Sequence, residues 1–70
     1  MNFNTIRYFL MTAQEASFSR AADRLYITQQ TLSGQIAALE KELGCRLFVR
    51  KVPLQLTYGG EVFLEYARRF

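Results

Sequence analysis

Two stripes of apolar residues at helical spacing dominate the pattern of this chain. The first consists of Phe18, Ala21, Ala22 and Leu25, and the second consists of Leu32, Ile36, Leu39 and Leu43. Residues three or four positions apart lie on one face of an α-helix, so each stripe predicts the buried side of a helix. Only residues 26–28 separate the two segments, so the helices must cross at a steep angle. This layout is typical of a DNA-binding helix-turn-helix.

The second predicted helix, about residues 29–43, lacks charges on most of its outward face. Its outward residues are Gln30, Thr31, Gly34, Ala37, Ala38 and Lys41, flanked by Gln29, Ser33 and Gln35. Amides and hydroxyls hydrogen-bond to base edges, and small side chains let a helix enter the major groove. Gly34 costs about 1 kcal/mol relative to alanine inside a helix, which favours close approach of a partner there. We interpret this segment as a recognition helix; the alternative is a polar surface without a partner.

Capping residues mark the ends of these helices. Ser17 is the expected N-cap of the first, and the Thr28 hydroxyl is expected to accept a hydrogen bond from an amide near Thr31. Gly44 stands at the expected C-cap of the recognition helix, after a charged turn at 40–42. The free N–H groups at the start of the recognition helix suit it to a phosphate.

A further helix is predicted on the N-terminal side, running from an N-cap at Asn2 or Asn4 to about Glu15. Its expected core stripe consists of Phe3, Ile6, Phe9, Leu10 and Ala13. This helix should therefore pack beneath the two central helices.

After Gly44 the pattern changes to two short β-prone runs, residues 47–50 and 54–57. A hairpin that follows a helix-turn-helix is a wing, so the predicted fold is mainly α, a winged helix-turn-helix. The wing spans about residues 47–57, and its tip carries Arg50 and Lys51, placed to contact phosphates or a minor groove. The alternative interpretation is an ordinary solvated hairpin.

Two more cations, Arg20 and Arg24, lie one turn apart on the outward side of the helix that precedes the turn. They are candidate phosphate ligands. The alternative is an ordinary solvated face that Asp23 partly neutralises.

A last helix is predicted from about Gly60, with Thr57 as its cap. Its apolar face consists of Phe63, Tyr66, Ala67 and Phe70. This face either packs on its own domain or remains partly exposed as a dimer interface. Three helices and a wing leave little core for all four side chains to enter. No glycine or proline ends this helix, and we expect the chain to be a fragment of a longer protein.

Composition narrows the classes of function. Seventy residues form one small domain, and with 50% hydrophobic and 14% aromatic residues a core can form. The chain has no histidine and one cysteine, Cys45, so we expect no disulfide, metal site, cofactor or catalytic centre. No membrane span or signal-peptide pattern is evident, which predicts a soluble, cytoplasmic protein. The net charge of +3 favours nucleic acid only weakly.

As a set, these residues resemble the N-terminal DNA-binding domain of LysR-type transcriptional regulators. The resemblance covers Ile6, Phe9 and Ala13 in the opening helix, residues 17–48, Arg50, Leu56, Thr57 and Gly60. It departs from the family pattern at Gln30, where proline is common, at Gly34, where a longer and often basic side chain is common, and at Gly59, where alanine is usual. The wing is also shorter and carries fewer arginines.

The resemblance implies two domains, a winged helix-turn-helix at 1–57 and the start of a linker helix at 58–70 that pairs two subunits. It implies base or backbone contacts from Thr28, Gln29, Thr31, Ser33, Gln35 and Arg50. With the residues argued above added, the candidate DNA-contact set consists of Arg20, Thr28, Gln29, Gln30, Thr31, Ser33, Gly34, Gln35, Arg50 and Lys51. The candidate dimerisation set is Phe63, Tyr66, Ala67 and Phe70. A small-molecule effector would bind a C-terminal domain that these residues do not include.

The expected function is therefore sequence-specific binding of double-stranded DNA by a homodimeric bacterial regulator, at a partial inverted repeat. Two other classes stay open. A winged helix can bind proteins through its recognition face, although the basic wing and uncharged recognition face argue against that class. A winged helix can also belong to a nucleic-acid enzyme, but these residues contain no catalytic constellation.

Overall fold

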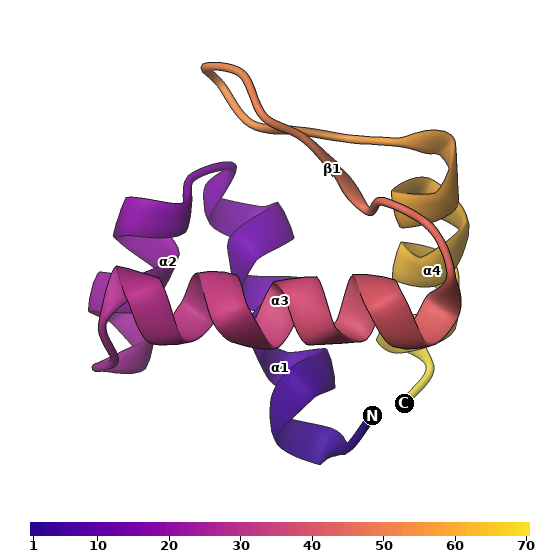
Figure 1. Ribbon diagram of the computed structural model, residues 1–70, viewed down its shortest axis with the longest axis horizontal. Coiled ribbons are helices and arrows are strands. Elements are labelled where there is room, and N and C mark those ends of the chain that lie inside the picture. The colour runs from indigo at the N-terminus through magenta and orange to yellow at the C-terminus, as the bar shows by residue number, and fades with distance from the viewer.

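The computed structural model covers residues 1–70 and contains four helices and one antiparallel hairpin (Figure 1). The elements are α1 (Phe3–Glu15), α2 (Phe18–Leu25), α3 (Gln29–Leu43), β1 (Phe48–Val49), β2 (Gln55–Leu56) and α4 (Tyr58–Arg68). Figure 1 shows α3 crossing α1 steeply, with α2 near the start of α3 and α4 near its end. The hairpin extends from the α4 side of the molecule back toward α2. The predicted mainly α, winged helix-turn-helix fold is confirmed.

Each helix begins at a residue whose side-chain oxygen accepts a backbone N–H three positions later. The N-caps are Asn2, Ser17, Thr28 and Thr57, with donor–acceptor distances of 2.9–3.1 Å. The cap predictions at 17, 28 and 57 are confirmed, and of the two candidates for α1 the structure uses Asn2. Gly44 ends α3 at φ +78°, a left-handed conformation in which glycine carries no Cβ penalty. Local chemistry therefore fixes the limits of the helices.

Phenylalanine rings join the hairpin and α4 to the helical core. Phe9 of α1 is fully buried, 5.0 Å from the Phe63 ring and 5.4 Å from the Phe48 ring between centroids. Phe18 packs edge-on against Phe48 at 5.7 Å. These contacts bring α1, α2, β1 and α4 into one cluster of thirteen buried hydrophobic residues. The domain boundary expected at residue 57 therefore does not separate two hydrophobic cores, because Phe63 and Ala67 of α4 belong to the same core as the preceding residues.

Two residues that the sequence pattern assigned to the core, Phe3 and Leu43, are exposed. Phe3 is 66% exposed, because it occupies the first turn of α1 and reaches only the Phe70 ring, at 6.3 Å. Leu43, the last residue of α3, is 36% exposed. Both core assignments are wrong, and both residues lie in a terminal turn of their helix, where fewer neighbouring elements cover the apolar side chain.

Glu40, in the charged turn at 40–42, is buried. Its Oε2 accepts the backbone N–H of Leu47 at 2.7 Å, and the residue is 7% exposed. Glu40 lies one helical turn after Ile36, so it continues the buried stripe of α3. The carboxylate thereby holds the end of α3 against the segment that leads into β1.

The start of α4 lies against the backbone that precedes β1. A Cβ at Gly60 would lie 2.1 Å from the Leu47 carbonyl oxygen, so only glycine fits there. The Thr57 hydroxyl also donates to the Arg46 carbonyl at 2.6 Å. The helix begins at Tyr58, two residues before the predicted start. These contacts fix the direction in which α4 leaves the wing.

Candidate nucleic-acid interface

The exposed side of α3 is uncharged through most of its length. Helix α3 spans the predicted range and carries no charged residue before Glu40. Its exposed residues before that point are Gln29, Gln30, Thr31, Gly34, Gln35, Ala37 and Ala38, and Ser33 is half-buried. Amides, hydroxyls and small side chains therefore form a continuous surface on the first three turns of the helix.

The hydroxyls of Thr28 and Thr31 have different roles in this surface. Thr28 Oγ1 accepts the Thr31 N–H at 3.0 Å and donates to Thr31 Oγ1 at 2.9 Å. The Thr28 hydroxyl thus has two partners within the domain, whereas the Thr31 hydroxyl has one and keeps capacity for an external ligand. Thr28 is a capping residue, and Thr31 is the better placed of the two to donate to a ligand.

Gly34 is not required by the packing of the domain. A Cβ built at this position would have no heavy atom within 4 Å, in contrast to Gly60. The helix accepts a residue of low helix propensity although alanine would fit. The fold itself therefore does not require glycine at this position.

The cations around α3 differ in whether an acidic side chain neutralises them. Arg24 forms a surface ion pair with Glu15, at 3.7 Å between Nε and Oε2. Asp23 lines the same hollow as Arg20 and Arg24 but forms no ion pair with either of them. The other ion pairs join the N-terminal amine to Glu42 and Arg68 to Glu65. Arg20, Arg50 and Lys51 are therefore exposed cations without an acidic partner.

The wing has shorter strands than the sequence predicts, and a longer tip. The register pairs Phe48 with Leu56 and Val49 with Gln55. Leu54 leaves the ladder because its N–H donates to the Ala16 carbonyl at 3.1 Å, which ties the wing to the loop before α2. Residues 50–54 thus form the tip.

An open hollow of about 330 Å³ lies between this tip and the starts of α2 and α3. Its polar lining consists of Ser17, Ser19, Gln29, Arg50 and Lys51, beside the Phe18 ring. No acidic residue lines it. The arrangement brings together Gln29, Arg50 and Lys51 from the predicted contact set, whereas Arg20 lies with Arg24 at a separate hollow beside Tyr26.

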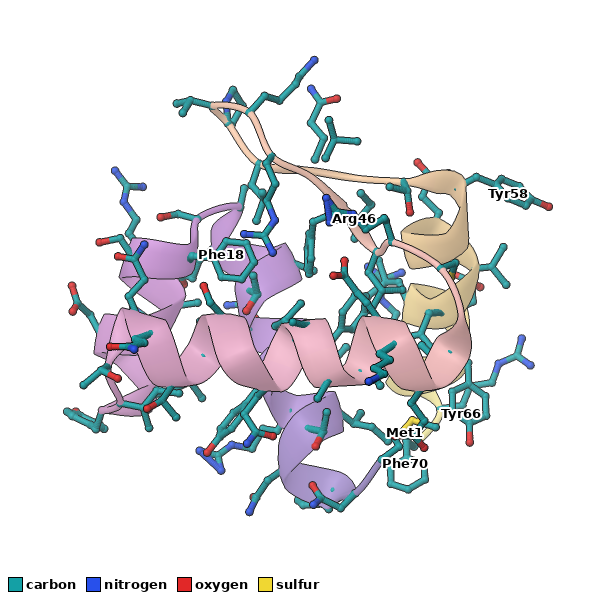
Figure 2. The ribbon with its side chains drawn as sticks, viewed as in Figure 1. Met1, Phe18, Arg46, Tyr58, Tyr66 and Phe70 are labelled. Carbon is teal, nitrogen blue, oxygen red and sulfur yellow. The ribbon has the colours of Figure 1, made fainter.

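The outer face of α4 differs from the predicted one. Phe63 and Ala67 are 7% and 2% exposed and belong to the domain core, so their assignment to a free face is wrong. The close approach at Gly60 turns that side of the helix inward. The exposed apolar stripe consists of Tyr58, Val62, Tyr66 and Phe70, each 52–83% exposed. Figure 2 shows Tyr58, Tyr66 and Phe70 on the outer side of the molecule. These four residues recur every four positions along the chain, so the sequence alone could have indicated this stripe.

No group of three or more histidine, cysteine, aspartate or glutamate side chains is assembled as a metal site would require. None of the four helices combines the length and hydrophobicity of a membrane span.

Comparison with protein families identifies the family of this chain. The model of the bacterial regulatory helix-turn-helix proteins of the lysR family matches residues 3–61, which include all of α2, α3 and the wing. The chain belongs to the LysR family. Its seventy residues correspond to the helix-turn-helix DNA-binding domain of that family.

Curated relatives of this LysR-family domain are much longer than the chain. The HTH-type transcriptional regulator CatR of Pseudomonas putida is 46% identical over 65 residues, which are 93% of this chain and 22% of CatR. The regulator TfdS of Cupriavidus pinatubonensis is 47% identical over 70 residues, covering 99% of this chain and 24% of TfdS. The chain thus spans about a quarter of the length of these relatives.

Solved structures of LysR-family proteins share the fold. The BenM DNA-binding domain in complex with benA site 1 DNA matches with a TM-score of 0.95 at 43% identity, covering 99% of this chain and 79% of that one. The CbnR DNA-binding domain in its DNA complex matches with a TM-score of 0.93 at 38% identity, covering 99% and 80%. Both likenesses include the wing and the start of α4.

Proposed function

We propose that this domain binds duplex DNA sequence-specifically, as the DNA-reading part of a cytoplasmic LysR-type transcription regulator. Helix α3 enters the major groove, and the wing contacts the adjacent backbone or minor groove. The observation that carries the proposal is the exposed face of α3, uncharged up to Glu40, with Arg50 and Lys51 at the hollow that borders its first residue, Gln29. The similarity to the BenM and CbnR domains, each solved with DNA, supports it.

The residues divide into two classes of contact. The cations Arg20, Arg50 and Lys51 are suited to phosphates, which orient a protein on the duplex without reading sequence. The side chains of Gln29, Gln30, Thr31, Ser33 and Gln35 are suited to base edges. Gly34 lets the helix backbone approach the base pairs, because no side chain occupies the space outside it. Thr28 supports this surface by capping α3.

We further propose that two copies pair through the outer face of α4. Tyr58, Val62, Tyr66 and Phe70 expose apolar surface along one side of the helix, next to the exposed Phe3 ring. An interface between identical copies must be self-complementary about a two-fold axis. Two recognition helices related in this way would bind two half-sites of a partial inverted repeat. A small-molecule effector would then act through a separate C-terminal domain.

Selection of DNA by the purified chain tests the DNA-binding proposal. A random-sequence duplex library is enriched, and the affinity for the selected duplex is compared with that for a scrambled duplex of equal length and composition. We expect clear discrimination between the two, and an affinity that falls with salt at a log–log slope of about −0.9 per phosphate contact. Equal affinity for both duplexes would contradict sequence-specific binding. A slope near zero would contradict the phosphate contacts.

A further inference from the structure

Phe18, the first residue of α2, lies between the hydrophobic core and the wing. Its side chain is buried, at 9% exposed, and its ring packs edge-on against Phe48. The same ring carries the Arg50 guanidinium, with Cζ 4.3 Å from the ring centroid. This distance is well inside the range of about 6 Å over which a cation is attracted by an aromatic face. Figure 2 shows Phe18 on the side of the helices that faces the hairpin.

The Phe18 ring is the one specific partner of the Arg50 side chain. Arg50 takes part in none of the three ion pairs and none of the side-chain hydrogen bonds of the domain. Contact with an aromatic face does not use the N–H donors of a guanidinium, which carries five of them. Arg50 is therefore held in place while its donors remain free.

The hollow beside this pair has the chemistry of an anion site. Phe18 and Arg50 both line it, together with Ser19, Gln29 and Lys51, and no carboxylate faces it. Gln29 is also the first residue of α3, so the hollow borders the recognition helix directly. In the proposed complex, the backbone of a duplex whose major groove holds α3 passes this edge of the domain.

We propose that Phe18 is a positioning residue for DNA binding: its ring holds the Arg50 guanidinium at this hollow, where the guanidinium binds a backbone phosphate. The inference rests on the proposed DNA-binding function. It assigns to Phe18 a role beyond its place in the core. Loss of the ring should lower the affinity for duplex DNA about two- to fivefold, the range given by a cation–π contact at an exposed site.

A double-mutant cycle on a mixed-sequence DNA duplex at low salt tests this coupling. The four proteins are the unaltered chain, Phe18→Leu, Arg50→Ala and the double variant. If Phe18 acts through Arg50, Phe18→Leu lowers affinity in the unaltered chain and has no effect in the Arg50→Ala background. An equal loss in both backgrounds would show a merely structural role and overturn the inference.

Matched variants separate the aromatic contact from core packing. Phe18→Tyr keeps the ring face and should restore affinity to within about twofold of the unaltered chain. Phe63→Leu removes another buried ring, which packs against Phe9 and not against Phe18 or Arg50, and it should leave DNA affinity unchanged. A similar loss in Phe63→Leu and Phe18→Leu would assign the effect to general loosening of the core and contradict the inference.

An NMR measurement keeps the inference testable if Phe18→Leu does not fold. In the free domain, the Arg50 side-chain N–H resonance should be displaced by the ring current of Phe18, and the displacement should persist when the duplex is added. Its loss on binding would mean that Arg50 leaves the ring, which overturns the inference.

The choice of duplex tests the phosphate assignment itself. Arg50→Ala should weaken binding to A·T-rich and G·C-rich duplexes equally, because phosphates are common to both. A much larger loss on the A·T-rich duplex would place Arg50 in the minor groove and contradict the assignment. Failure of the unaltered chain to bind any duplex would instead contradict the proposed function, so the two failures are distinguishable.

Discussion

Replacing Phe63 with alanine separates the packing of α4 from the pairing of two subunits. The Phe63 ring is 7% exposed and packs edge-on against the fully buried Phe9 ring, 5.0 Å away at 77°. Truncating a buried phenylalanine to alanine destabilises a protein by about 3–5 kcal/mol. A domain of this length has a total stability of about 4–10 kcal/mol. Phe63→Ala should therefore remove a third or more of the free energy of unfolding, and it can unfold the domain outright.

The matched control is Tyr66→Ala, on the exposed side of the same helix. Tyr66 is 52% exposed, and its ring lies tilted against the Phe63 ring, 5.6 Å away between centroids. Its replacement should cost less than about 1.5 kcal/mol. Urea denaturation followed by far-UV circular dichroism, at a protein concentration too low for dimers, measures both values. Equal losses in the two variants, or a larger loss for Tyr66→Ala, would refute the assignment of Phe63 to the core.

Three further predictions concern the hydrogen bond at the end of α3, the glycine on its exposed face and the outer side of α4. Glu40→Ala should destabilise the domain by about 1–3 kcal/mol, because it leaves the Leu47 N–H without an acceptor, whereas Glu40→Gln should cost less; urea denaturation compares them. Gly34→Ala should stabilise the fold by up to about 1 kcal/mol yet weaken binding to the selected duplex; a destabilised variant, or one of unchanged affinity, would contradict the reasoning. Tyr66→Glu should reduce pairing in analytical ultracentrifugation while its melting temperature stays close to that of the unaltered chain; unchanged pairing would exclude Tyr66 from the interface.

The sequence predicted the helices well because local chemistry decides their limits. Asn2, Ser17, Thr28 and Thr57 each place an oxygen three residues before a free amide, and Gly44 supplies a left-handed C-cap. These signals act within a few residues and do not depend on the rest of the fold. The recognition helix, the three-residue turn before it and the wing could therefore be placed from the sequence alone.

The sequence predicted less well which residues near the helix ends are buried, because contacts with other elements decide that burial. Phe3, in the first turn of α1, is exposed, while Glu40 is buried and accepts a backbone N–H from another segment. Phe63 is turned inward because Gly60 lets α4 approach the Leu47 carbonyl, a contact between residues far apart in the sequence. A helical stripe identifies an apolar face, but it does not show which neighbour covers that face.

Among the candidate contact residues, too, the sequence located what depends on local pattern and missed what depends on contacts between elements. The uncharged face of α3 follows from helical periodicity, so the sequence located it. The stacking of Arg50 on Phe18 depends on how the wing folds back toward α2, which no local pattern encodes. The sequence thus identified Arg50 as a candidate cation without showing what holds it.

The central claim is that the exposed side of α3 reads the bases while the wing holds the backbone. The most direct test compares Ser33→Ala and Lys51→Ala for their affinities on the selected duplex and on its scrambled control. Ser33→Ala should lower affinity for the selected duplex by about 1–3 kcal/mol with little change on the scrambled one, so discrimination falls. Lys51→Ala should weaken binding to both duplexes by the same factor, so discrimination is kept. If Ser33→Ala lowers both affinities equally, α3 does not read sequence at this position and the account is contradicted.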